Sequence, residues 1–122
     1  MKCIYLNVEE KAFPKVIDID DDLKVFYKLI GCQYVDMVRR KIGDKHYVII
    51  CDDEGLFKEN PIVSAVDTNF KPMFVGNLII VKDGEDGEVI GLSEEDIKQI
   101  LRNTNTYFTF KNNIYQALQM SY

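Results

Sequence analysis

Apolar residues in this chain follow two different periods, and the change of period along the chain predicts its elements. Short runs rich in Val, Ile, Tyr and Phe favour strands at residues 2–8, 13–19, 32–42, 46–51 and 73–83. Gly43–Lys45 falls between two of these runs, which predicts a turn that joins them as a hairpin. Gly76 interrupts the last run and indicates a bulge or a close backbone approach.

The helical period appears clearly in two segments. Leu23, Phe26, Tyr27 and Ile30 form one apolar stripe, preceded by the acids of residues 20–22 and followed by Gly31 as a C-cap. The segment "GLSEEDIKQILRN" has Ser93 and Asp96 at capping-box spacing before its apolar stripe. Two weaker patterns predict a helical turn that starts at Pro61 and a final helix in "NNIYQALQM".

These elements predict an α+β fold in a single domain, with a mostly antiparallel sheet of four to six strands packed on one side by two or three helices. We expect residues 1–102 to form the core domain. Residues 103–122 contain no acid and five of the aromatic residues, so they predict a separate C-terminal element, docked on the core or on a partner.

Composition narrows the class of protein. The chain has 122 residues, a net charge of −5 and a pI near 4.8, which argues against direct nucleic-acid binding. Cys3, Cys32 and Cys51 have unrelated spacings, so they predict free thiols rather than a disulfide framework or a zinc site. We find no pattern of a signal peptide or of a membrane-spanning helix, and expect the protein to stay in the cytoplasm.

Patterns of catalytic and metal-binding residues are weak. The acidic segments "DIDDD" and "DGEDGEVIGLSE" lack glycine at the position that a calcium loop requires. His46 and Cys51 have odd spacing on one predicted strand, so they should point to opposite faces and form no dyad. The stretch "CDDEGLFKENPIVSAV" is interpreted as a turn, in which Gly55 relieves the backbone before Asn60 and Pro61 start the next element. We therefore predict no enzymatic activity, no cofactor and no metal site.

Two groups of residues are the candidate partner-binding surface. The first is the acidic turn, and the second is the aromatic tail, which is typical of interfaces because Tyr and Phe are favoured there; together they comprise Asp83, Glu85, Asp86, Glu88, Tyr107, Phe108, Phe110 and Tyr115. A homodimer formed through the C-terminal element is a further prediction. If the fold gathers the acids on one face, they would suit a basic groove of another protein. The alternative is scattered, solubilising charge.

Three stretches carry a family resemblance: "KVIDIDDDLKVFYKLIGC", "CDDEGLFKENPIVSAV" and "VGNLIIVKDGEDGEVIGLSEEDIKQIL". Across residues 14–102 they resemble an uncharacterised domain-of-unknown-function family found in phages, plasmids and conjugative elements of Gram-positive bacteria. Cys32 stands where glycine is common in that family, and the tail from Asn103 resembles an addition. The family has no assigned catalytic residues to transfer.

The resemblance implies an accessory protein of a phage or mobile element. We expect a non-enzymatic binder that antagonises a host defence system by protein contact. The first alternative is a module that sequesters a nucleotide messenger at an oligomer interface, for which Arg39, Arg40 and Lys41 are the only compact basic run. The second is a regulator internal to the element.

Overall fold

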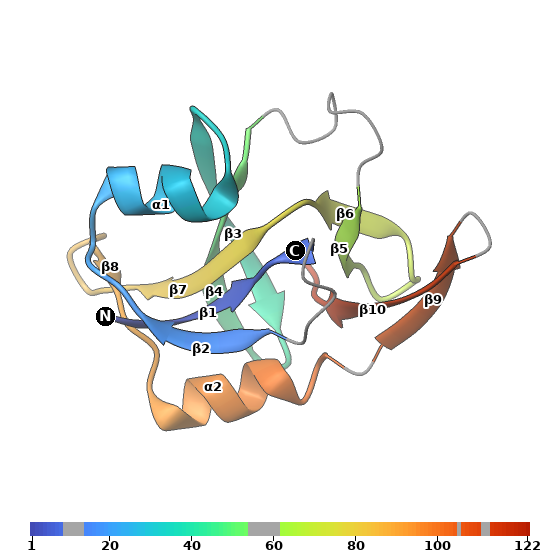
Figure 1. Cartoon of the computed structure of the whole chain (residues 1–122). Helices are drawn as coiled ribbons and strands as arrows, with labels where there is room; N and C mark the ends of the chain where they lie inside the picture. The colour runs from blue at the N-terminus through green and yellow to red at the C-terminus, as the bar shows by residue number, and fades with distance from the viewer. Residues whose placement is uncertain (9–13, 54–61, 105, 111–112) are drawn as a thin grey trace.

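The computed structural model describes residues 1–8, 14–53, 62–104, 106–110 and 113–122, with the backbone alone over the parts of 106–116 that it describes (Figure 1). Its elements in chain order are β1 (Lys2–Leu6), β2 (Lys15–Asp18), α1 (Leu23–Ile30), β3 (Val35–Ile42), β4 (Lys45–Asp52), β5 (Val63–Val66), β6 (Pro72–Val75), β7 (Leu78–Asp83), β8 (Val89–Ile90), α2 (Glu94–Leu101), β9 (Thr106–Phe110) and β10 (Asn113–Gln119).

The strands form two sheets. The larger has the order β2-β1-β7-β4-β3, with β8 paired to the end of β7, and all of its described pairings are antiparallel. The smaller has the order β6-β5-β10-β9, and its β10–β5 pair is parallel. The α+β class, the single domain and the mostly antiparallel pairing are therefore confirmed, although the strands are divided between two sheets.

Both faces of the larger sheet are covered, rather than the one face that we expected. On one face, Phe26 and Ile30 of α1 pack over Val48, Ile50 and neighbouring apolar side chains. On the other face, Ile100 of α2 and Leu118 of β10 pack within the larger core cluster. Figure 1 shows α1 and α2 on opposite sides of the sheet. The three central strands, β1, β7 and β4, are consequently buried on both faces over most of their length, which explains their nearly continuous apolar runs.

The caps predicted for the two helices are confirmed. The Asp22 side chain accepts a hydrogen bond from the N–H of Lys24, and Gly31 ends α1 in the left-handed conformation with φ of 78°. Ser93 and Asp96 make both hydrogen bonds of a capping box at the start of α2. Local sequence therefore defines both helices correctly.

Two helical predictions are wrong. Residues 63–66 form β5, all four of its residues are buried, and it lies between β6 and β10. Residues 113–119 form β10 instead of a helix, since they pair with β9 and with β5. Gly55, Asn60 and Pro61 lie outside the described residues.

The apolar run at residues 73–83 is also two strands and not one. Gly76 has φ of 79°, a conformation that favours glycine, and its N–H donates to the carbonyl of Ile62 at 2.8 Å. The chain changes direction here, so β6 belongs to the smaller sheet and β7 to the larger. The sequence correctly predicted an irregularity at Gly76, but the chain passes there from one sheet to the other instead of forming a bulge.

Candidate functional site

The antiparallel order of the larger sheet gathers several segments at one end of the molecule. β2 and β7 both run antiparallel to β1, so the start of β1 lies beside the ends of β2 and β7. The N–H of Leu92 donates to the carbonyl of Lys2 at 2.8 Å, and that of Ile19 donates to the carbonyl of Met1 at 3.0 Å. These contacts bring the starts of α1 and α2 to the same end, at the left of Figure 1.

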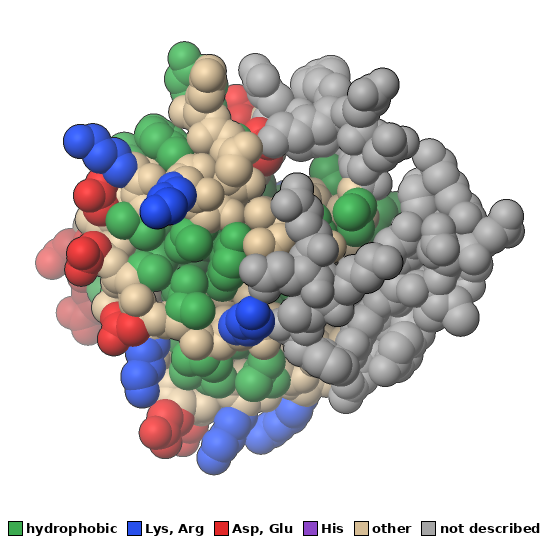
Figure 2. Space-filling view, in the orientation of Figure 1, with side chains coloured by type: hydrophobic (Ala, Val, Ile, Leu, Met, Phe, Trp, Pro, Cys, Tyr) green, Lys and Arg blue, Asp and Glu red, His purple; other side chains and the backbone are tan. Residues whose placement is uncertain are grey.

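This end of the molecule carries a group of acids, which we call the acidic end. Its acids are contributed by three separate segments, all of them exposed except the half-buried Asp83: Asp18, Asp20, Asp21, Asp22, Asp83, Glu85, Asp86, Glu88, Glu94 and Glu95. Figure 2 shows acidic side chains gathered along this edge of the visible face. The sheet topology thus brings three acidic segments to one end of the sheet, whereas Asp52 and Asp53 lie at the opposite end.

Several cationic groups near the acidic end are engaged in internal ion pairs. The N-terminal ammonium of Met1 lies 2.6 Å from Asp18, a contact that raises the pKa of the ammonium and lowers the pKa of Asp18. Arg39 pairs with Asp83, and Lys82 lies 2.7 Å from the buried Asp96. Two of these partners, Asp18 and Asp83, belong to the acidic end, so the pairs neutralise two of its acids and leave the other eight.

The β7–β8 turn holds all four predicted acids close together in sequence and space. The N–H of Gly84 donates to the carbonyl of Glu88 at 2.6 Å, and the N–H of Asp86 donates to the Glu88 carboxylate at 3.0 Å. Glu88 therefore stabilises the turn, and Asp83 is held by Arg39. Glu85 and Asp86 are exposed, which leaves their carboxylates as the most accessible acids of the turn.

The predicted aromatic residues lie away from this turn. Tyr107, Phe108 and Phe110 are in β9, and Tyr115 is in β10, where its backbone pairs with Phe108. Their side chains lie outside the described part of the structure. In Figure 1 the β9–β10 hairpin is on the opposite side of the molecule from β8 and the start of β1. The acidic and aromatic groups hence do not form one continuous surface.

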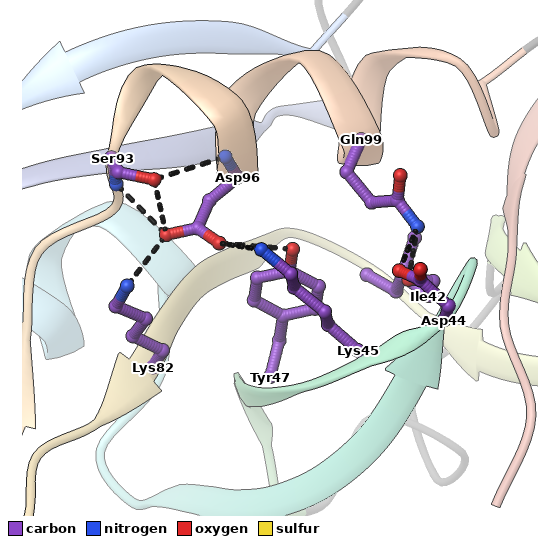
Figure 3. A network of polar contacts seen from close by, with 8 residues as sticks. All are labelled: Ile42, Asp44, Lys45, Tyr47, Lys82, Ser93, Asp96 and Gln99. Carbon is purple, nitrogen blue, oxygen red and sulfur yellow. Dashed lines mark hydrogen bonds and ion pairs between the residues drawn. The ribbon is translucent and has the colours of Figure 1, made fainter.

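A buried carboxylate lies under the acidic end and was only partly anticipated (Figure 3). The Asp96 side chain is 2% exposed and accepts hydrogen bonds from the Ser93 N–H at 2.9 Å, the Ser93 hydroxyl at 2.9 Å and the Lys82 ammonium at 2.7 Å. The Tyr47 hydroxyl donates to its second oxygen at 3.2 Å, and the Lys45 ammonium lies 3.9 Å from that oxygen. The capping box was predictable, but the three residues from β4 and β7 meet Asp96 only through the fold.

The environment of Asp96 favours a structural role. Burial by itself raises the pKa of Asp96, but the hydrogen bonds from Lys82 and Ser93 outweigh it and lower the pKa to about 2. Burial, followed by the nearby Asp96 charge, raises the pKa of Tyr47. A carboxylate that stays ionised and a phenol that stays protonated do not exchange protons near neutral pH. We therefore interpret this network as a tie between α2 and the sheet.

The basic run at residues 39–41 is divided by the strand geometry. Successive residues of β3 point to opposite faces, so Arg39 reaches Asp83 while Arg40 faces the smaller sheet. The Arg40 guanidinium lies 4.6 Å from the centre of the Tyr122 ring and 5.5 Å from that of Phe74. Arg39 and Arg40 therefore do not converge on one ligand position, whereas the nucleotide alternative requires several cations around one ligand.

The thiols and the histidine give no sign of a nucleophile. Burial raises the pKa of Cys3 to about 11 and that of Cys51 to about 12, so both thiols are protonated at neutral pH. All three cysteines are free, and the half-buried Cys32 donates from its sulfur to the carbonyl of Tyr34 at 3.2 Å. His46 is exposed and pairs with Lys41, whereas Cys51 pairs with Asp36 five residues along β4. The two side chains therefore lie on opposite faces of β4, as predicted.

Metal-binding clusters and membrane-spanning helices are both absent from residues 1–8, 14–53, 62–104, 106–110 and 113–122. Within these ranges, no three His, Cys, Asp or Glu side chains are grouped so that they could hold a metal ion. In the same part of the chain, neither helix has the length and apolar character needed to cross a membrane.

Comparison with models of protein families shows to which family the chain belongs. Residues 1–105 match the family described as "Domain of unknown function (DUF3846)", so the chain belongs to this family. The matched range includes both helices and every strand through β8, and it ends before β9. No curated protein and no solved structure matches the chain.

Proposed function

We propose that this member of the DUF3846 family is a non-enzymatic accessory protein of a phage or mobile element, and that it antagonises a host defence system by binding a basic protein surface through its acidic end. The observation that carries this proposal is the convergence of three acidic segments at one end of the larger sheet. Each segment alone is an ordinary turn or helix cap. Together they make a local excess of negative charge that suits a protein surface evolved to bind nucleic acid.

The pairing of nearby cations supports the same proposal. Arg39 and Lys82 lie close to the acidic end but are used in ion pairs with Asp83 and Asp96. A solubilising surface interleaves cations among its acids, whereas here two cations stabilise the fold that displays the acids. Exposed Lys2 and Lys24 remain as local cations, so the field is reduced but not cancelled.

The nucleotide-sequestering alternative has less support. It needs several cations around one position, whereas the Arg39 guanidinium pairs with Asp83 and the Arg40 guanidinium lies over the Tyr122 ring. A regulator internal to the element would bind an element protein in place of a host protein, and gene neighbourhood together with the identity of the captured partner distinguishes it from the leading proposal.

The test is a pull-down from host lysate, followed by titration of the captured protein at two salt concentrations. Binding should weaken steeply between about 50 and about 500 mM salt, because exposed charges are screened over that range. Glu85→Lys should weaken binding about tenfold at low salt, since it removes one attraction and adds one repulsion.

The matched control is Asp53→Lys. Asp53 is exposed and follows the end of β4, which lies opposite the acidic end because β4 runs antiparallel to β7. The same change of charge at this position should leave the affinity nearly unchanged. An equal loss of affinity in the two variants, or an affinity that does not change with salt concentration, would contradict a role for the acidic end.

A further inference from the structure

The outer edge of β3 is open over most of its length. β3 pairs with β4 through eight consecutive residue pairs without a bulge, and it is the last strand of the larger sheet. On its other edge, only Lys41 has a described partner strand, because its N–H and carbonyl bond to Ser121 at 2.7 and 2.8 Å. Tyr122 follows and places its ring over Arg40. Among the residues that the structure describes, Val35–Arg39 has no neighbouring strand on this side.

The direction of the backbone groups follows from the hydrogen bonds at the two ends of the strand. Lys41 points its N–H and carbonyl outward, to Ser121, whereas the carbonyl of Tyr34 points inward and accepts from the N–H of Asp53 at 3.3 Å. The backbone groups of successive residues alternate between the two edges of an antiparallel strand. The N–H and carbonyl groups of Val35, Met37 and Arg39 therefore also point to the outer edge. Such a row is a template for another strand. Met37, which is 41% exposed, and Tyr34, which is 64% exposed, add apolar surface beside it.

We propose that this edge pairs with the same edge of a second copy of the chain, antiparallel and centred on Met37. In this register Met37 faces Met37 of the second copy, and Val35 faces Arg39 at both ends. Each of these pairs exchanges two main-chain hydrogen bonds. The open segment is symmetric about Met37, so each outward group of one copy faces an outward group of the other. The Arg39 carbonyl also accepts from its own Arg40 guanidinium at 2.8 Å and has a second lone pair for the dimer.

Neighbouring registers are excluded by contacts on each side. A register centred on Asp36 sets two carboxylates directly opposite each other, which is destabilising. A register centred on Val38 sets Asp36 of the second copy opposite Arg40, where Tyr122 already lies. Centring on Met37 separates the two Asp36 carboxylates and keeps the pairing of β3 within Val35–Arg39, so that only Tyr34 of the second copy, which precedes β3, comes opposite Arg40 and beside Tyr122. It also places each Asp36 diagonal to Arg40 of the second copy, within reach of a long side chain. The register is therefore set by repulsion between the two Asp36 carboxylates on one side and by Ser121 and Tyr122 of the same chain on the other.

Sedimentation of the full chain tests this dimer. The protein should show a concentration-dependent dimer, and Met37→Lys should make it monomeric because two ammonium groups would meet at the symmetry axis. The matched control is Val16→Lys, since Val16 is 46% exposed on β2, the other outer strand of the same sheet. That variant should remain dimeric. Unchanged circular dichroism and melting temperature of Met37→Lys would establish that the loss of dimer is not a loss of fold.

A crosslinking experiment tests the register. In a Cys32→Ser background, Met37→Cys should form an intermolecular disulfide quickly, because Cα atoms of a hydrogen-bonded pair are about 5.5 Å apart, within the disulfide range. Arg39→Cys lies on the same edge and face, but its copies are separated by several residues along the strand and should crosslink slowly. A protein that stays monomeric at about 1 mM, a Met37→Lys variant that stays dimeric, or equal crosslinking of the two variants would overturn the proposal.

Discussion

Replacing Asp96 by Asn should remove a pH-dependent part of the stability of this fold. Asp96 is 2% exposed and its pKa is lowered from 3.8 to about 2, chiefly by Lys82 and Ser93 acting against burial. A difference of one pKa unit between folded and unfolded chains corresponds to about 1.4 kcal/mol. Ionised Asp96 therefore contributes about 2 kcal/mol to the free energy of unfolding at neutral pH.

The sign of the pH dependence follows from the direction of the shift. The folded chain binds the Asp96 proton less tightly than the unfolded chain does, so this contribution is complete above about pH 4 and is lost as the pH falls toward 2. The Asp96→Asn variant has no carboxylate at this position and lacks the contribution at every pH. The two unfolding free energies should differ by about 2 kcal/mol at pH 7 and should converge as the pH approaches 2.

Urea denaturation of both proteins between pH 7 and pH 2 measures this convergence. Glu95→Gln is the control, because Glu95 is the exposed neighbour of Asp96 in the same helical turn. It should follow the wild-type curve within a few tenths of a kcal/mol. A gap between wild type and Asp96→Asn that stays constant over the pH range would refute the ionic role of Asp96 and leave only a neutral capping contact.

Three further predictions concern single contacts. Gly31→Ala should cost about 1 kcal/mol of unfolding free energy, because φ is 78° and a Cβ would meet no other atom there, so left-handed strain is the whole effect. Asn77→Ala should cost about 2 kcal/mol, because the N–H of Val8 loses the side-chain oxygen that it binds, whereas the carbonyl of Leu29 keeps its hydrogen bond from Tyr5; denaturant titration can measure this loss. In the native protein a thiol reagent should modify Cys32 quickly, and should reach buried Cys3 and Cys51 only on unfolding.

The sequence contained enough information for the helices because their signals are local. Asp22, Gly31 and the Ser93–Asp96 capping box bind groups within a few residues, so their spacing alone predicts their contacts. The β3–β4 hairpin was predictable for the same reason, since Gly43 permits a tight turn between two apolar runs.

Errors arose where long-range pairing decides the structure. Strand β5 is buried along its whole length, and a short continuous apolar run does not distinguish a buried strand from a helix. Strand β10 contains Ala117, Leu118 and Gln119, which favour helix locally, but its pairing with β5 buries Leu118 in the main core. β5 and β10 are far apart in sequence, so no local pattern predicts that they pair.

Whether the acidic turns form one surface was equally invisible to local reasoning. Each acid caps a helix or solvates a turn, and it is the central position of β1 between β2 and β7 that brings these segments to one end. If this combined surface binds the partner, no single segment should be essential. Asp21→Lys, Glu85→Lys and Glu94→Lys come from three different segments, so their effects on binding free energy should add. Isothermal titration of the single and triple variants would show this, and a triple variant no weaker than Glu85→Lys alone would confine binding to the β7–β8 turn.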